Sequence, residues 1–244
     1  MDRADPSTLR ASNRVASMYF DVRDRVVGTV AMLPVEQLST RVPACPEWTV
    51  HDLLAHLVST PMTILAGDIP DEVMGGGDPN PWLGELVEDN AGRSVIELAR
   101  WWASDDEALA EVVGGAGLLL ADLMAHEGDL HGAIGSRAHR CAPELDAQGD
   151  AALAGLRPGI VAAGLPPICV DTGTDRHSSG EGDPGWTLRT TLWEAHRALN
   201  SRRTREELAV LEHEGDPSMY FEVLHSHLPL PVQSLGERST SSDD

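Results

Sequence analysis

The stretch from Ala121 to His131 holds residues whose types and spacing could do chemistry. On an α-helix, Asp122 and His126 lie about 40° apart around the axis and roughly 6 Å apart along it, so a carboxylate and an imidazole project from one face. Asp129 falls within roughly 60° of His126 on the same face, whereas His131 lies about 140° away. This helix therefore offers two ligands for one divalent metal ion, and a third ligand would come from another helix.

His56 is the upstream residue that could complete this set. It follows Leu53 by three positions in an apolar helix, so its side chain points toward the buried side, whereas His51 points elsewhere. Two imidazoles and one carboxylate with an open coordination position form a catalytic rather than a structural zinc pattern.

The helix that carries Asp122 is mostly apolar. Its apolar members are Leu118, Leu119, Leu120, Leu123, Met124 and Leu130. Burial of the polar groups at positions 122, 126 and 129 would be costly without partners, which favours a shared metal ion or a polar network. The competing interpretation is an ordinary hydrogen-bonded pair of Asp122 and His126 on a helix surface, and spacing alone does not separate the two.

The composition is that of a globular protein with one large domain or two small ones. The chain has 244 residues, of which 41% are hydrophobic and 23% charged. A net charge of -21 argues against binding to nucleic-acid backbones or anionic lipid. We find no secretory signal and no run of about 18 apolar residues, and three widely spaced cysteines suit reduced thiols. We therefore expect a cytoplasmic protein without nucleic-acid or membrane partners; its oligomeric state stays open.

The first part of the chain reads as an antiparallel bundle of helices. Apolar residues at three- and four-residue steps predict a helix over residues 7–33, which Pro34 closes. Two prolines exclude a helix over residues 42–48 and favour a loop. Gly114 and Gly115 end a mostly helical run over residues 82–113, just before the helix that carries Asp122.

The helix with His56 has recognisable ends. Thr49 is a candidate N-cap, and Asp52 lies at capping-box spacing from it. Pro61 is expected to end or kink this helix.

After Pro143 the pattern changes to that of a small α+β domain. Short strands are predicted at 168–171 and 186–191, joined by a hairpin connection or mobile loop over 173–185, with helices at 144–163, 192–200, 204–213 and 218–227. We therefore expect a metal-binding helical bundle over residues 1–150 and a small α+β domain over 151–235. The polar end, residues 236–244, is expected to be a disordered tail.

Two stretches of the sequence resemble motifs of a known family. Cys45 to His56 contains Cys-Pro-Glu-Trp-Thr-Val, then Asp-Leu, then a histidine, and resembles the second-helix motif of the mycothiol-dependent maleylpyruvate isomerase family, whose zinc-binding histidine matches His56. The family motif Glu-x-x-x-His-x-x-Asp-Leu is similar to Asp122–Leu130 except at its first position. A weaker third match lies between Asn200 and Pro217, in the part that corresponds to the family's C-terminal domain.

This resemblance implies a mainly α fold, in which a DinB-like antiparallel four-helix bundle precedes a small α+β C-terminal domain. It also implies that His56, Asp122 and His126 hold zinc, and that Asp129 supports the ligands or positions their helix. Aspartate is one methylene shorter than the glutamate usual at position 122. The metal must therefore lie nearer this helix, bind more weakly or be absent.

The chemistry that such a site supports is the activation of a thiol. Zinc with an open position lowers the pKa of an incoming thiol, and the resulting thiolate can attack an electrophilic small molecule. An adduct that is kept makes the enzyme an S-transferase, and an adduct that rotates and expels the thiol makes it a cis–trans isomerase. By resemblance the low-molecular-weight thiol is mycothiol. In this hypothesis Asp129 is catalytic, and Arg202 or Arg203 binds a substrate carboxylate in bidentate fashion.

Other interpretations remain open from the sequence. A metal-dependent hydrolase would use zinc-bound water with Asp129 or Glu127 as the base, and a non-catalytic metal- or ligand-binding bundle would act through partners. The pair Arg202 and Arg203 could instead be a solvated helix start. Cys45 has no base near it in the sequence, so we expect it to pack as a small buried side chain.

Overall fold

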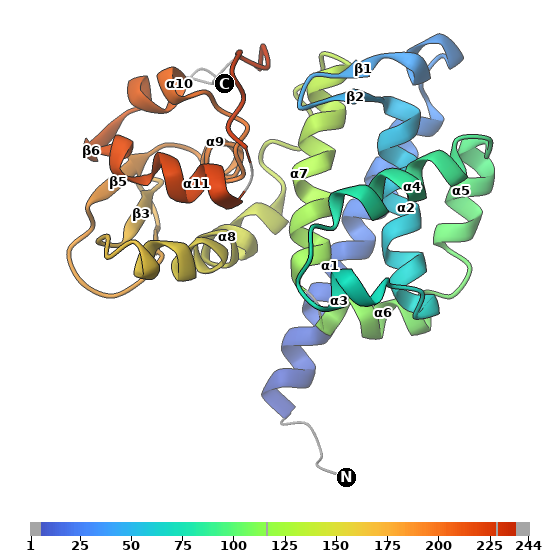
Figure 1. Cartoon of the computed structure of the whole chain (residues 1–244), viewed down its shortest axis with the longest axis horizontal. Coiled ribbons are helices and arrows are strands. Elements are labelled where there is room, and N and C mark those ends of the chain that lie inside the picture. The colour runs from blue at the N-terminus through green and yellow to red at the C-terminus, as the bar shows by residue number, and fades with distance from the viewer. Residues whose placement is uncertain (1–5, 116, 228, 238–244) are drawn as a thin grey trace. The chain divides into compact units, whose positions relative to one another are not determined.

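A computed structural model describes residues 6–115, 117–227 and 229–237 of the chain. The chain divides into two compact units, Met1–Ser136 and Arg137–Asp244. Helices dominate both units, so the mainly α class is confirmed, and the second unit also contains a small sheet (Figure 1).

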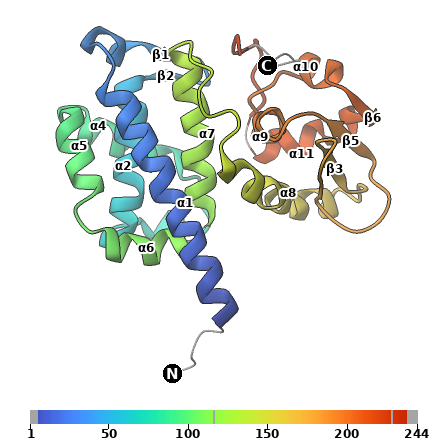
Figure 2. The ribbon, with the colours of Figure 1, turned by 180° about the vertical axis from the view of Figure 1, so that it is seen from behind.

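The N-terminal unit is built around one central apolar helix. Its helices are α1 (Pro6–Ala31), α2 (Val50–Ala66), α3 (Asp71–Met74), α4 (Asn80–Asn90), α5 (Val95–Trp102), α6 (Asp106–Gly115) and α7 (Gly117–Ala133). Helix α2 packs against α4, α5, α6 and α7, while α1 packs against α6 and α7 (Figures 1 and 2). Within the described part of the chain, no single helix is long and apolar enough to cross a membrane, although α6 and α7 would meet that test as a bent pair.

The stretch before α2 forms a small β-ribbon, so the prediction of a loop over residues 42–48 is wrong. Strands β1 (Arg41–Val42) and β2 (Cys45–Thr49) pair antiparallel, with Arg41 opposite Thr49. Its prolines exclude a helix, but a two-stranded ribbon has only edge strands, where a missing N–H donor is tolerated. The ribbon contacts α2 and α7, the two helices that carry the candidate ligands.

The predicted start of α2 is confirmed, whereas the helix does not end at Pro61. Thr49 Oγ1 accepts a hydrogen bond from the Asp52 backbone, and the Asp52 carboxylate accepts one from the Thr49 backbone. Pro61 lies inside the helix, which continues to Ala66. The tight packing of α2 against its neighbours therefore outweighs the loss of one backbone hydrogen bond.

The C-terminal unit contains a four-stranded sheet in the order β4-β3-β5-β6. Strand β3 (Ile168–Asp171) pairs antiparallel with β4 (Arg176–Ser178) and parallel with β5 (Trp186–Arg189), which pairs antiparallel with β6 (His213–Gly215). The strand predicted at 168–171 is confirmed. It forms a hairpin with β4, which lies within the segment predicted to be a hairpin connection or a mobile loop. The other elements of this unit are α8 (Pro143–Ala162), α9 (Leu192–Leu199), α10 (Arg205–Val210), the 3-10 helix η2 (Pro217–Tyr220) and α11 (Phe221–His227).

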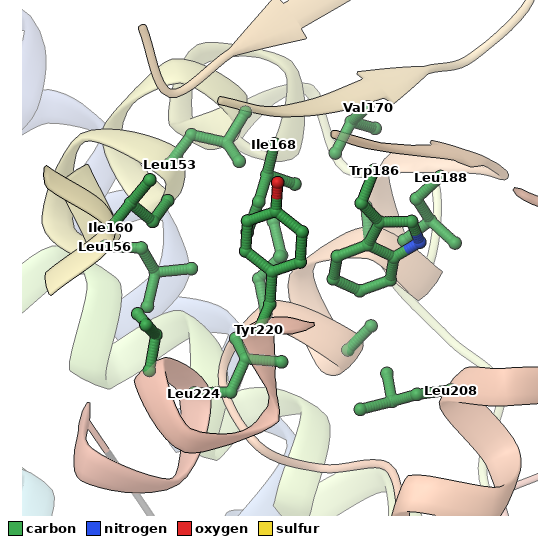
Figure 3. Close-up of a cluster of buried hydrophobic side chains, with 14 of the residues drawn as sticks. Leu153, Leu156, Ile160, Ile168, Val170, Trp186, Leu188, Leu208, Tyr220 and Leu224 are labelled. Carbon is green, nitrogen blue, oxygen red and sulfur yellow. The ribbon is translucent and has the colours of Figure 1, made fainter. Parts of the chain in front are cut away.

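Helix α8 belongs to the core of this second unit. Leu153, Leu156 and Ile160 on α8 are buried with Trp186 of β5 and Leu224 of α11 in one apolar cluster (Figure 3). The boundary between the units therefore lies between Ser136 and Arg137 rather than at residue 150. Burial of the apolar face of α8 against the sheet and α11 is the physical reason for this correction.

The predicted tail falls mostly outside the described residues, which end at Glu237. The side chain of Glu237 is 5% exposed and forms ion pairs with Arg197 and Arg203. Packed structure therefore extends to Glu237 and includes the first two residues of the stretch expected to be disordered.

Candidate metal centre

Helices α2 and α7 bring His56, Asp122 and His126 together. His56 Nε2 lies 3.3 Å from Asp122 Oδ2, and His126 Nε2 lies 3.5 Å from Asp122 Oδ1. Ligand atoms of the three residues all lie within 4.8 Å of one another. One carboxylate therefore faces two imidazoles, one oxygen toward each.

These distances match what a tetrahedral zinc site needs. Zinc–ligand bonds of about 2.0–2.1 Å place neighbouring ligand atoms roughly 3.3–3.4 Å apart. The side chains of His56 and His126 are buried, while that of Asp122 is 34% exposed. The donor types and their spacing therefore fit a divalent ion, and Asp122 is the most exposed of the three residues.

The Nδ1 atom of each imidazole contacts a polar side chain on its own helix. Thr60 Oγ1 lies 3.3 Å from His56 Nδ1 on α2, and Asp129 Oδ2 lies 2.9 Å from His126 Nδ1 on α7. Such contacts orient a histidine so that its remaining nitrogen faces the metal. Asp129 is fully buried and contacts the candidate ligand His126, so its placement is that of a positioning residue. Thr60 was missed from the sequence, although its four-residue spacing from His56 on α2 was a usable signal.

The charge on His126 follows from its surroundings. Burial lowers the pKa of this imidazole, but Asp122, the hydrogen bond to Asp129 and the contact with Cys45 outweigh burial and raise the pKa to about 10. In the metal-free protein His126 is therefore an imidazolium that two carboxylates neutralise. A metal ion must displace that proton to bind.

The β-ribbon supplies two further side chains to this centre. The ring of Trp48 lies 4.8 Å from the ring of His56 and 6.0 Å from that of His126. Cys45 Sγ lies within 4.8 Å of a ring nitrogen of His126 and a carboxylate oxygen of Asp129. The prediction that Cys45 packs as a small buried side chain is only partly right, because Cys45 is half-buried and lies beside His126 and Asp129.

Glu127 and His51 are engaged elsewhere. Glu127 forms a bidentate ion pair with Arg25, with contacts of 2.9 and 3.1 Å that join α1 to α7. His51 Nε2 lies 2.7 Å from the backbone oxygen of Arg93. Neither residue is in the three-residue cluster of His56, Asp122 and His126.

The two arginines predicted to bind substrate lie in the C-terminal unit and are buried. Arg203 donates from Nε and Nη2 to Glu194, at 2.6 and 2.8 Å, and from Nη1 to Glu237 at 2.7 Å. Arg202 Nη1 donates to the backbone oxygen of Asn200. Neither arginine lies on a solvated helix surface, and a substrate carboxylate at Arg203 would have to displace an internal one.

Removal of the carboxylate behind His126 tests the positioning role of Asp129. The substitution Asp129→Asn keeps the size of the side chain and removes the charge that holds the His126 Nδ1 proton. We expect zinc affinity to fall about 10–100-fold, the usual effect of losing such a partner. Competition with a chromophoric chelator measures this, and an affinity equal to that of the wild type would contradict the role.

The raised pKa of His126 predicts proton release on metal binding. Between pH 7 and 9 the metal-free imidazole is protonated, because its pKa is about 10. Zinc binding should therefore release one proton from His126, and the apparent affinity should rise about tenfold per pH unit. Calorimetry in buffers of different ionisation enthalpy counts this proton. An affinity independent of pH over this range would contradict the assignment.

Comparison with known proteins identifies part of the chain. Residues 19–118 match the family model described as the mycothiol maleylpyruvate isomerase N-terminal domain. The matched segment includes the β-ribbon and His56 and ends before Asp122. No curated protein and no solved structure matches the chain. Residues 19–118, which make up most of the N-terminal unit, are therefore similar to the mycothiol maleylpyruvate isomerase N-terminal domain.

Proposed function

We propose that the N-terminal unit is a zinc-dependent enzyme centre that uses a low-molecular-weight thiol, mycothiol, to attack an electrophilic small molecule. His56, Asp122 and His126 would hold the zinc ion. The observation that carries the proposal is the pair of distances, 3.3 and 3.5 Å, from the Asp122 carboxylate to the two imidazole nitrogens. The family match of residues 19–118 supports the choice of mycothiol. The same proposal includes a DinB-like four-helix arrangement for this unit.

Zinc bound there would lower the pKa of a thiol so that the thiolate is present near neutral pH. Residues around the site would support this by orienting the two imidazoles and by limiting the access of water. Asp129 and Thr60 fix the two imidazoles, so the ligand geometry is set before a substrate arrives. Trp48 covers the imidazoles with an apolar ring, which limits access of water to them. The partly exposed edge at Asp122 is the route by which thiol and electrophile would enter.

The chemical steps conserve atoms and electrons in both proposed outcomes. The thiolate sulfur forms a bond to an electrophilic carbon of an unsaturated substrate, and the π electrons move onto the conjugated oxygen. Protonation of this adduct leaves a thioether, which is the S-transferase outcome. Rotation about the former double bond, followed by reversal of the same electron movement, expels the thiolate and gives the trans isomer.

The hydrolase alternative lacks a base among the residues considered for it. Asp129 is bound to His126 Nδ1, and Glu127 is bound to Arg25 in a bidentate pair. Arg202 and Arg203 take no part in the proposed metal chemistry, because Arg203 is bound to Glu194 and Glu237. The thiol-dependent reaction therefore fits the described contacts better.

Assays with purified, zinc-loaded protein separate these functions. Elemental analysis should find about one zinc per chain. Mycothiol would then be added with maleylpyruvate in one experiment and with a general thiol-reactive electrophile in another. Isomerisation that needs but does not consume mycothiol, or thiol consumption with adduct formation, supports the proposal. Hydrolysis without thiol, or no reaction in either experiment, rejects it.

A further inference from the structure

The C-terminal unit gathers several of the chain's few positive charges around Trp193. The chain contains 18 Lys+Arg against 39 Asp+Glu, and every one of the 18 is arginine. The guanidinium of Arg140 lies 3.9 Å from the Trp193 ring centre, and that of Arg203 lies 5.5 Å from it. Arg197 and Arg203 are 0% and 3% exposed. Buried guanidinium groups require internal anions, so the identity of those anions matters.

Glu237 is the carboxylate that joins the two buried arginines. Its Oε2 accepts from Arg197 Nε at 3.0 Å and from Arg203 Nη1 at 2.7 Å. Its Oε1 accepts from Arg197 Nη2, which completes a bidentate contact. Planar guanidinium groups in this arrangement bind any planar carboxylate in the same way. The two arginines therefore form a carboxylate-binding site that Glu237 fills.

The second carboxylate, Glu194, is held differently. It is a residue of α9, the helix that also carries Arg197, and Thr191 caps this helix. Its carboxylate binds Arg203 from the opposite pair of nitrogens, Nε and Nη2. Arg203 therefore keeps one partner that is fixed by a helix when its contact with Glu237 is lost.

Glu237 stands on a strap, residues 229–237, that has neither helix nor strand. Leu230 anchors the strap in the apolar cluster of the unit, and Ser234 donates a hydrogen bond to Glu207. Between these anchors Val232 is 95% exposed. The segment near the label C in Figure 1 thus carries a buried carboxylate on irregular backbone, and the ion pairs of Glu237 are among the contacts that hold it in place.

We propose that Arg197 and Arg203 form a binding site for a small carboxylate ligand, and that Glu237 occupies it in cis until the ligand displaces the strap. When Glu237 leaves, Nε and Nη2 of Arg197 and Nη1 of Arg203 lose the carboxylate that they bind, and these donors would take the ligand's carboxylate. Arg140 beside Trp193 adds positive charge to this region. Burial and the nearby Arg137 lower the pKa of Arg140, and Glu237 opposes part of this effect. The inference concerns the C-terminal unit alone and does not depend on zinc or thiol chemistry.

Chemical rescue of the full-length variant Glu237→Ala tests the site. Loss of the carboxylate removes the anion that the buried Arg197 and Arg203 share and should lower Tm by about 10 °C or more. Acetate or succinate should then restore part of this loss and raise the Tm of the variant far more than that of the wild type, by mass action on the vacated site. Succinamide, which is uncharged, should have no such effect. The variant Glu237→Gln, which keeps the side-chain shape, should bind succinate at least tenfold more tightly than the wild type.

Glu222→Ala is the matched control, because Glu222 pairs with Arg205 on the surface, where the side chains are 81% and 49% exposed. Its Tm should change little, and acetate should not rescue it. In the wild-type chain, succinate should speed trypsin cleavage after Arg238 at least twofold, detected as release of the peptide 239–244. Inorganic phosphate in place of succinate reports whether the site prefers planar carboxylates. Absence of both rescue in Glu237→Ala and succinate-dependent cleavage in the wild type would overturn the proposal.

Discussion

The substitution His56→Ala is expected to remove zinc from the purified protein. His56 supplies one of only two imidazoles in the three-residue cluster, and its Nε2 lies 3.3 Å from the Asp122 carboxylate. Since losing even a residue behind a ligand costs about 10–100-fold in affinity, losing the ligand should cost more than ~100-fold. Metal content should therefore fall from about one ion per chain to less than about 0.1 after dialysis. Mycothiol-dependent turnover should fall in parallel.

His51→Ala is the control for this experiment. His51 lies five residues earlier on α2, and its imidazole contacts the backbone of Arg93 instead of the cluster. This variant should keep its zinc and its activity. Near-UV circular dichroism distinguishes loss of metal from loss of fold, because the fully buried Trp102 reports the packing of the same unit. Stoichiometric zinc in folded His56→Ala would reject the whole metal centre.

The residues of the centre that share a helix were predictable from spacing. Asp122, His126 and Asp129 lie on one face of α7, because the helical repeat fixes that face. The β-ribbon contacts were not predictable in the same way. Cys45 and Trp48 approach His126 because the ribbon that carries them packs against α2 and α7. Local periodicity carries no information about such contacts between distant segments.

The burial of Arg202 and Arg203 was also not predictable from local sequence. Arg202 and Arg203 lie in a charged stretch that resembles a solvated helix start, yet they are 8% and 3% exposed. The anions that bind the buried Arg203 are Glu194 and Glu237, and the latter lies far along the chain from it. Charge pattern along a sequence does not reveal which distant carboxylate will neutralise a cation.

The domain boundary was misplaced for a related reason. The amphipathic pattern predicts a helix over 144–163 and is confirmed by α8 (Pro143–Ala162). That pattern shows which face is apolar but not which core buries it. The cluster with Trp186 and Leu224 assigns α8 to the second unit. The local sequence therefore predicted that this segment is a helix. It could not predict the unit to which α8 belongs, because that depends on contacts with elements later in the chain.

Asp122 is the position at which this chain departs from the glutamate usual in the family motif, and two substitutions test its role. Asp122→Asn keeps the shape but replaces one ligand oxygen by an amide nitrogen and removes the negative charge. We expect zinc affinity to fall more than ~100-fold, because the remaining ligands are two neutral imidazoles. Asp122→Glu keeps the charge but moves the carboxylate about 1.5 Å further from the backbone of α7.

The observed geometry decides the expected order of affinities. The shorter aspartate already lies 3.3 and 3.5 Å from the two imidazole nitrogens, the spacing that tetrahedral zinc requires. Glutamate at this position would crowd His56 and His126, so Asp122→Glu should bind zinc more weakly than the wild type but more tightly than Asp122→Asn. Competition with a chromophoric chelator ranks the three proteins. Asp24→Asn, which removes a charge from a side chain that is 70% exposed on α1, controls for the change in net charge and should bind zinc like the wild type. Tighter binding by Asp122→Glu would show that the site is preformed for the longer side chain, and unchanged binding by Asp122→Asn would exclude Asp122 as a ligand.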